Sequence, residues 1–323
     1  MTENPINLRI GGVPEHFNLP WRMAIEEGKF LNENINLIWS DFGGGTGAMA
    51  NALRNNELDL AIMLTEGITA DIIAGNAVGN KAKIIKVYVK SPLTWGIYRL
   101  NNNIQITPNP SLGSRGTFNS PLLKEGLGVV TSFDQLKKNI PSLRYAISRF
   151  GSGSHLMACV DACKREWDIK TLNFVELKNL VGMCEGLKND LADVFMWESV
   201  MTQPHVNSGL LEKLDETITP WSCFMLVASE NVLKNNPLEI QKICHIINDY
   251  VKDFKTKPSI LEKLATRYQI NLEKTAYWLH NTHWATDNEI PTEMLENVME
   301  ELFKAKIIRQ KMGNPNQLFQ IIR

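Results

Sequence analysis

The sequence lacks the features that would place it in a membrane or on nucleic acid. No apolar run is long enough to span a bilayer, and residues 1–7 have neither the basic region nor the apolar core of a secretory signal. The net charge is −1, and lysine and arginine are spread evenly along the chain. This pattern excludes a nucleic-acid footprint and a polybasic membrane patch. We therefore expect no nucleic-acid partner and no membrane insertion.

Cysteine is scarce and widely scattered. The five cysteines are an odd number, at Cys159, Cys163, Cys184, Cys223 and Cys244. Their number and spacing argue for free thiols in a reducing compartment rather than a disulfide framework. Together with the missing secretory signal, they predict a cytoplasmic protein.

Familiar cofactor and metal motifs are also missing. The glycine-rich turns at 43–47 and 151–154 are not followed by Gly-Lys-Ser/Thr, and they lack the register of a dinucleotide fingerprint. His280 and His283 share a helical face, but no carboxylate or cysteine lies at ligand spacing from them. We therefore assign no catalytic residue, no metal ligand and no cofactor.

What the sequence does contain is an alternation of strands and helices. With 323 residues, 44% of them hydrophobic and 21% charged, the chain suits a soluble globular protein of two lobes. Strands are predicted at 7–12, 36–41, 58–64, 83–89, 143–150, 172–177 and 193–197, with helices after most of them. Such alternation predicts an α/β fold in which each lobe has a mostly parallel sheet flanked by helices. The segment after residue 229 reads as helical.

Two extended crossings are expected to join the lobes, near 91–100 and near 217–229. Lobe 1 is then discontinuous, with residues 1–94 and 219–323, and lobe 2 comprises residues 95–218. Residues Asn101–Gly128 are rich in Asn, Pro and Gly and are too long for an ordinary connection. They read as a flap or a loose insertion.

Two short stretches of the chain have almost the same sequence pattern. Residues 52–66 and 186–198 each read as the end of a helix, a tight turn, a short apolar strand and an acidic residue. Ligands in open α/β sheets bind at the carboxyl ends of the strands. The repeat therefore predicts two similar lobes that offer Glu66 and Glu198 to a cleft between them.

The candidate ligand-binding residues follow predicted strands or flank the crossings. Glycine-rich helix starts can bind an anion or a carbonyl oxygen, tryptophans can stack on a flat ligand, and the two glutamates suit hydrogen-bond donors. The candidates are Pro14, His16, Trp21, Gly44, Gly45, Thr46, Thr65, Glu66, Trp95, Gly151, Ser152, Ser154, His155, Trp197, Glu198 and Trp221.

Each of these residues also has a structural interpretation. The glycines can be ordinary punctuation between a strand and a helix, and a tryptophan is more often core than ligand platform. Glu66 and Glu198 can be carboxylates that a helix dipole stabilises. His16 and His155 can be an acid–base pair or can serve only as hydrogen-bonding groups.

In their order along the chain, these segments resemble the type II periplasmic-binding-protein fold. The likeness is carried by Gly11-Gly12-Val13-Pro14-Glu15-His16, by Ala24-Ile25-Glu26-Glu27-Gly28-Lys29-Phe30, by Leu58-Asp59-Leu60-Ala61-Ile62 and by Phe150-Gly151-Ser152-Gly153-Ser154-His155. It covers most of the chain from about residue 8 to 229. The closer likeness is to the branch that binds thiamine pyrimidine precursors, aliphatic sulfonates and nitrate, and to a small cytosolic subfamily of that fold.

This resemblance implies two lobes that close around a small heterocyclic ligand similar to the thiamine pyrimidine. The missing export signal departs from the fold's usual role and makes a membrane transporter a doubtful partner. The alternative is a cytosolic enzyme on the same fold, in thiamine-pyrimidine or menaquinone-type metabolism. The thiamine-pyrimidine synthases use a histidine, which His16 could match, and a dense cysteine cluster, which the scattered cysteines here do not match.

Overall fold

The computed structural model describes residues 4–74, 81–101, 133–139 and 142–322. The segment Asn101–Gly128, expected to be a flap or a loose insertion, lies outside the described residues from position 102 onward. The chain divides into two compact units. Unit 1 is Met1–Leu93 with Thr219–Arg323, and unit 2 is Thr94–Ile218.

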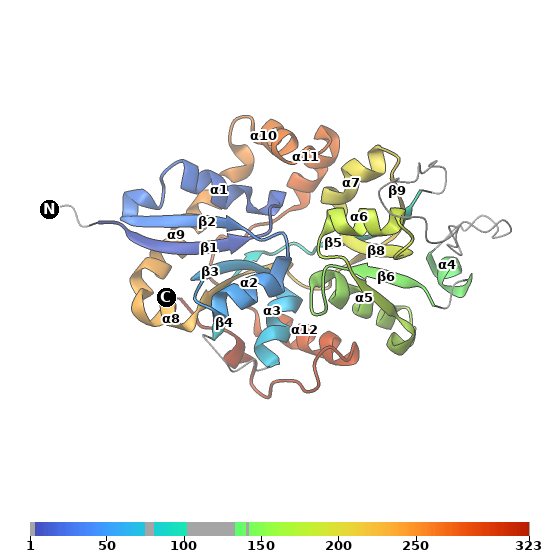
Figure 1. The fold of residues 1–323 in the computed structure, drawn as a ribbon. Helices are drawn as coiled ribbons and strands as arrows, with labels where there is room; N and C mark the ends of the chain where they lie inside the picture. The colour runs from blue at the N-terminus through green and yellow to red at the C-terminus, as the bar shows by residue number, and fades with distance from the viewer. Residues whose placement is uncertain (1–3, 75–80, 102–132, 140–141, 323) are drawn as a thin grey trace. The chain divides into compact units, whose positions relative to one another are not determined.

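Unit 1 is a five-stranded sheet with helices on both faces (Figure 1). Its strands are β1 (Ile6–Gly12), β2 (Ile35–Asp41), β3 (Leu60–Leu64), β4 (Ala82–Val89) and β10 (Phe224–Ser229). Its helices are α1 (Leu19–Glu26), α2 (Gly45–Arg54), α3 (Thr65–Ile73), α8 (Glu230–Asn235), α9 (Pro237–Lys252), α10 (Ile260–Tyr268), α11 (Leu272–Asn281) and α12 (Thr292–Lys304). The strand order is β2-β1-β3-β10-β4, and β10 runs antiparallel to both of its neighbours.

Unit 2 repeats this plan with a second five-stranded sheet. Its strands are β5 (Thr94–Leu100), β6 (Arg144–Ile147), β7 (Asn173–Glu176), β8 (Val194–Glu198) and β9 (Leu211–Ile218). Its helices are α4 (Phe133–Asn139), α5 (Gly153–Lys164), α6 (Leu180–Lys188) and α7 (Ser199–Asn207). The order is β7-β6-β8-β5-β9, and β5 is antiparallel to both neighbours. In each sheet the other four strands share one direction, which confirms the predicted fold class.

Burial follows the position of each strand in its sheet. The central strand β3 is a continuous apolar run that is almost wholly buried, as expected for a strand covered by helices on both faces. The edge strand β2 instead alternates buried and exposed residues over its first four positions. Helix α7 was not predicted, because it contains Pro204 and buries only Thr202, so no apolar stripe marks it. Helix α4 was not predicted either.

The same ion-paired clamp fixes the central strands of both sheets. In unit 1, the Arg9 guanidinium on β1 donates to both carboxylate oxygens of Asp59, which precedes β3, at 2.9 and 2.8 Å. In unit 2, Arg144 on β6 donates to both oxygens of Asp193, which precedes β8, at 3.0 and 2.7 Å. Each arginine also donates to a backbone carbonyl in the turn before its partner strand. Bidentate pairs of this kind set strand register. The two stretches of similar sequence therefore form equivalent turns and strands in the two units.

Each sheet has one point at which the connections change direction. In unit 1 the chain leaves β1 toward β2 and leaves β3 toward β4, on opposite sides of the β1–β3 pair. In unit 2 it leaves β6 toward β7 and β8 toward β9. Ligands in open α/β sheets bind outside the carboxyl ends of the strands at such switch points. The candidate ligand-binding segments are therefore those that follow β1 and β3 in unit 1 and β6 and β8 in unit 2.

Candidate functional site

Glu66 is the most unusual side chain at the carboxyl edge of unit 1. It is the second residue of α3, directly after β3, and it is fully buried. Its Oε2 accepts a hydrogen bond of 2.9 Å from Trp221 Nε1, whereas its Oε1 has no partner among the described residues. Burial raises the pKa of Glu66 to about 7, although its hydrogen bonds favour the charged form. A buried carboxylate oxygen without a donor is costly, and a ligand's N–H or O–H would offset that cost.

Two threonines and a backbone turn hold this region together. Thr46 Oγ1 accepts the Leu64 N–H at 3.0 Å, and Thr65 Oγ1 donates to the Ser222 carbonyl oxygen. A Cβ on Gly67 would lie 2.6 Å from the Thr46 methyl group, so α2 and α3 meet closely here. The structure thus brings Thr46 and Thr65 to the segments that carry Glu66 and Trp221. Both hydroxyls serve the fold.

The glycine turn before α2 faces open space. Gly44 is the N-cap of the helix, and Gly45 has a φ of +66°, the left-handed region that favours glycine. A Cβ on Gly45 would meet nothing within 4 Å. The turn is thus required by backbone conformation and not by close packing.

The other predicted residues of unit 1 lie in two different environments. Pro14 is exposed in the loop after β1. Trp21 is fully buried in the core, where its ring stacks on Phe30 at 5.8 Å and tilts against Tyr88 at 5.9 Å. Trp21 therefore has no ring face free for a ligand.

His16 is enclosed by aromatic rings. It is fully buried, and its ring centroid lies 4.6 Å from that of Phe17 and 4.1 Å from that of Trp278 on α11. Neither ring nitrogen has a hydrogen-bond partner among the described residues. Burial lowers the pKa of His16 to about 3, so the imidazole is neutral at pH 7.

In unit 2, Trp95 and Glu198 are neighbours on adjacent strands. They face each other directly in the antiparallel β5–β8 pair, and both are nearly buried. Glu198 is the N-cap of α7, and its carboxylate accepts the Met201 N–H at 2.7 Å. Burial raises the pKa of Glu198 to about 7. Glu198 thus performs the capping role that was its structural interpretation. Trp197 lies half-buried against the apolar cluster that contains Phe195.

In the turn between β6 and α5, serine hydroxyl groups lie within hydrogen-bond distance of one another and of the backbone. Gly151 has a φ of +78°, and Ser152 caps α5. Ser152 Oγ lies 3.0 Å from Ser154 Oγ, which in turn accepts the Ser148 N–H at 3.0 Å. The structure therefore brings Gly151, Ser152 and Ser154 together, with the serine hydroxyls engaged within the turn.

His155 follows this turn. Its Nδ1 accepts the Gly151 N–H at 3.1 Å, and its Nε2 lies 3.9 Å from Cys159 Sγ. Burial lowers the pKa of His155 to about 4. Of its two expected roles, the hydrogen-bonding role is the one that these contacts display.

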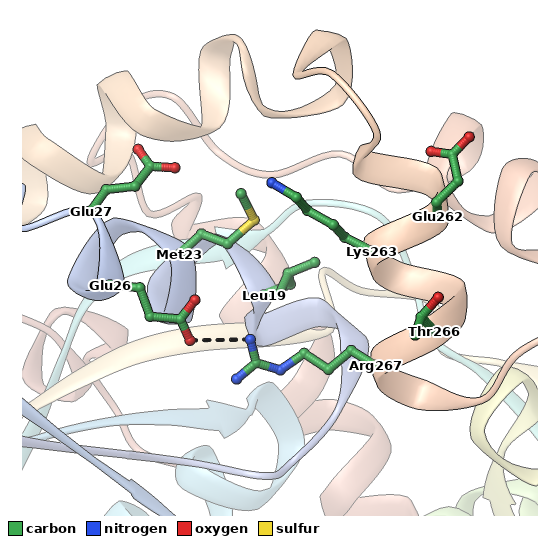
Figure 2. Close-up of a pocket in the computed structure, with 8 residues that line it drawn as sticks. All are labelled: Leu19, Met23, Glu26, Glu27, Glu262, Lys263, Thr266 and Arg267. Atoms are coloured by element: carbon green, nitrogen blue, oxygen red, sulfur yellow. Dashed lines mark hydrogen bonds and ion pairs between the residues drawn. The ribbon is translucent and has the colours of Figure 1, made fainter.

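Two cavities lined by described residues of unit 1 were not predicted from the sequence. One, of about 560 Å³, lies between α1 and α10 and is lined by Leu19, Met23, Glu26, Glu27, Glu262, Lys263, Thr266 and Arg267 (Figure 2). The other, of about 900 Å³, is lined by residues 288–292 and by Asn316, Phe319, Ile321 and Ile322. Neither includes a predicted site residue. Glu66 is nevertheless the residue at which the switch point of unit 1 coincides with a buried carboxylate oxygen that has no partner among the described residues.

Three further properties concern the described residues alone. No three His, Cys, Asp or Glu side chains among them are grouped so that they could hold a metal ion. No helix in the described ranges combines the length and apolar character needed to cross a bilayer. All five cysteines are free thiols.

Comparison with known proteins gives the fold. A family model described as Ca3427-like PBP matches residues 128–217, less than half of the chain. The structure of the Candida albicans CA3427 gene product, described as defining a new family with the generic periplasmic-binding-protein fold, is similar with a TM-score of 0.81. It is 21% identical, over 98% of this chain and 97% of that one. No curated protein sequence matches the chain.

Two bacterial binding proteins are also similar in structure. The alkanesulfonate-binding protein SsuA of Xanthomonas axonopodis pv. citri, bound to MOPS, has a TM-score of 0.70 and 10% identity over 96% of each chain. The nitrate-binding protein NrtA of Synechocystis PCC 6803 has a TM-score of 0.64 and 12% identity, over 94% of this chain and 85% of its own. The chain therefore has the periplasmic-binding-protein fold.

Proposed function

We propose that this protein binds a small molecule through the carboxyl edges of its sheets, with Glu66 as the principal polar contact. The observation that carries the proposal is the free oxygen of the Glu66 carboxylate, which is buried at the switch point of unit 1 beside Trp221. Similar folds that bind an alkanesulfonate and nitrate support small-molecule binding in general. The edge of unit 2, with Trp95 and the serine turn, is proposed to supply further contacts.

The chemistry of Glu66 favours a ligand that donates hydrogen bonds. A flat heterocycle with an amino group, such as the pyrimidine of thiamine, presents N–H donors to a carboxylate and an aromatic face to tryptophan. A simple oxyanion would be disfavoured beside the buried carboxyl group of Glu66. We therefore propose an aminopyrimidine-like ligand rather than sulfonate or nitrate.

The proposal also covers the movement of the two units and the cellular compartment of the protein. We infer that the two units close around the ligand, because the chain passes between them at only two points, Leu93/Thr94 and Ile218/Thr219. The free cysteines support a reducing, cytosolic compartment. No membrane transporter is included as a partner. The enzyme alternative draws no support from the histidines, because burial keeps the pKa values of His16 and His155 far below neutral pH.

Calorimetry with matched variants tests this function. A hydroxymethyl-aminopyrimidine should bind the protein, and the Glu66→Gln change should weaken it by about tenfold to a hundredfold, since a charge-assisted bond contributes roughly 1.5–3 kcal/mol. Glu293 is the matched control, because it is also the second residue of a helix, α12, but is exposed. The Glu293→Gln change should leave the affinity unaltered. Tight binding of nitrate or an alkanesulfonate that is insensitive to Glu66→Gln would refute the proposal.

A further inference from the structure

The corner of unit 1 around His16 collects polar atoms that have no partners. His16 Nδ1 and Nε2, Asn18 Oδ1 and Trp278 Nε1 are all buried without a hydrogen bond among the described residues. His16 and Asn18 lie in the 3₁₀ turn after β1, and Trp278 comes from α11. Unpaired buried polar groups are rare and costly, and the contacting rings of His16 and Trp278, with Asn18 in the same turn as His16, indicate a place that receives a polar molecule.

The cover of this corner comes from the C-terminal helices. The His16 ring meets Trp278 of α11 edge to face at 4.1 Å and Tyr268, the last residue of α10, at 6.1 Å. The interactions are aromatic contacts, which do not satisfy the imidazole nitrogens. The α10–α11 pair, residues 260–281, therefore encloses His16 without using its polar atoms.

A cavity lies between helix α10 and helix α1 of unit 1. The cavity of about 560 Å³ separates α10 from α1, with the buried Leu19 and Met23 on the α1 side (Figure 2). One ion pair spans it, from Arg267 Nη1 to Glu26 Oε1 at 3.2 Å, and both side chains are at least one-third exposed. Such an exposed pair is a weak fastening.

The chain also has unusual backbone conformations at both ends of α10. Ser259 before the helix and Gln269 after it each have a φ of +55°. The left-handed conformation is common after a helix, where Gln269 closes onto Ala265, but it is uncommon for a serine N-cap. Ser259 is therefore a strained joint at the start of the covering segment.

We propose that α10 and α11 form a hinged cover over His16, and that Tyr268 and Trp278 select the ring that enters beneath it. A neutral imidazole offers one donor and one acceptor, Trp278 Nε1 offers a donor and Asn18 Oδ1 an acceptor. The fitting occupant is a flat ring that carries both donors and acceptors, such as an amino-substituted heteroaromatic. This inference rests on the proposed function for the identity of the occupant, but not for the movement of the cover.

Chemical labelling of His16 tests the cover without any ligand. Diethylpyrocarbonate acylates neutral imidazoles that solvent can reach, and His16 is neutral at pH 7 because burial lowers its pKa to about 3. Mass spectrometry should show His16 labelling rise about two- to fivefold in Arg267→Gln and in Glu26→Gln, because each change removes the weak fastening. His245, whose side chain is 77% exposed, serves as the reference within each sample.

The Lys311→Gln variant is the matched control, since it breaks a similarly exposed pair with Glu300 elsewhere in unit 1. It should leave His16 labelling unchanged. Equal protection of His16 in all variants would overturn the cover, while the calorimetric test of Glu66 would be unaffected. An aminopyrimidine should restore the protection in Arg267→Gln and nitrate should not. Failure of the aminopyrimidine to protect would overturn the occupant proposed here.

Discussion

Replacing Glu66 by Gln should change how the stability of unit 1 depends on pH. In the folded protein burial raises the pKa of Glu66 to about 7, from an ordinary value of 4.5. The folded state then holds a proton at Glu66 between pH 4.5 and 7 that the unfolded state has released. The contribution of Glu66 to folding is thus fully present below pH 4.5 and is lost as the pH rises through 7.

The magnitude follows from the same values. A pKa difference of about 2.5 at roughly 1.4 kcal/mol per pH unit gives about 3 kcal/mol. The Gln side chain does not titrate, so the difference in unfolding free energy, wild type minus Glu66→Gln, should fall by about 3 kcal/mol between pH 4 and pH 8. Contributions from His16 and Glu198 are common to both proteins and cancel in this difference.

The assay must report on unit 1 alone, because a chain of two units need not unfold in one step. Hydrogen exchange of the β3 amides, followed by mass spectrometry at several urea concentrations and pH values, provides that reading. A difference for Glu66→Gln that stays constant, or that grows with pH, would refute the argument that burial dominates this carboxyl group.

Three further predictions follow from the geometry. Asp59→Asn and Asp193→Asn should each lower the unfolding free energy of their own unit by about 1.5–3 kcal/mol, measured by the same exchange method, and equal loss in both units from either change would contradict the separate clamps. Gly45→Ala should cost about 1 kcal/mol in thermal unfolding because of its positive φ, and a stabilising effect would disprove that reading. Small-angle scattering should show a smaller radius of gyration at saturation with an aminopyrimidine, and an unchanged radius would favour a rigid site.

The sequence predicts most of the fold because the strands obey simple patterns. The β3 segment is a short apolar run bounded by a turn, and the repeated phrase finds its partner in β8 at the equivalent place in the second sheet. Helix α7 was not predicted, because Pro204 and the lack of an apolar face obscure any helical periodicity in its sequence. The local sequence pattern is therefore sufficient to predict an element whose residues are buried at regular intervals. It is insufficient for a helix such as α7, which lacks an apolar face and is capped by a side chain.

The candidate site is predicted less completely, because the roles of its residues depend on distant contacts. The repeat places Glu66 and Glu198 at similar positions, but alignment on Asp59 and Asp193 shows that Glu66 lies two residues further along. Glu198 consequently caps its helix, whereas Glu66 has an oxygen to spare.

The burial of His16 could not be foreseen from its own segment. Trp278 and Tyr268, the rings that enclose it from α11 and α10, come more than 250 residues later in the chain. Trp21 likewise looks like a residue at the edge of the sheet, but the stacking of Phe30 on its ring places it in the core.

The most direct test of the central claim is native mass spectrometry of the protein purified from its own host. The account predicts a co-purifying molecule of low mass that absorbs as a heteroaromatic ring. That molecule should be retained by the Glu293→Gln variant and lost from Glu66→Gln. A protein that carries no such molecule in any form, or one that keeps it equally in Glu66→Gln, would contradict the claim that this fold binds a small ligand through Glu66.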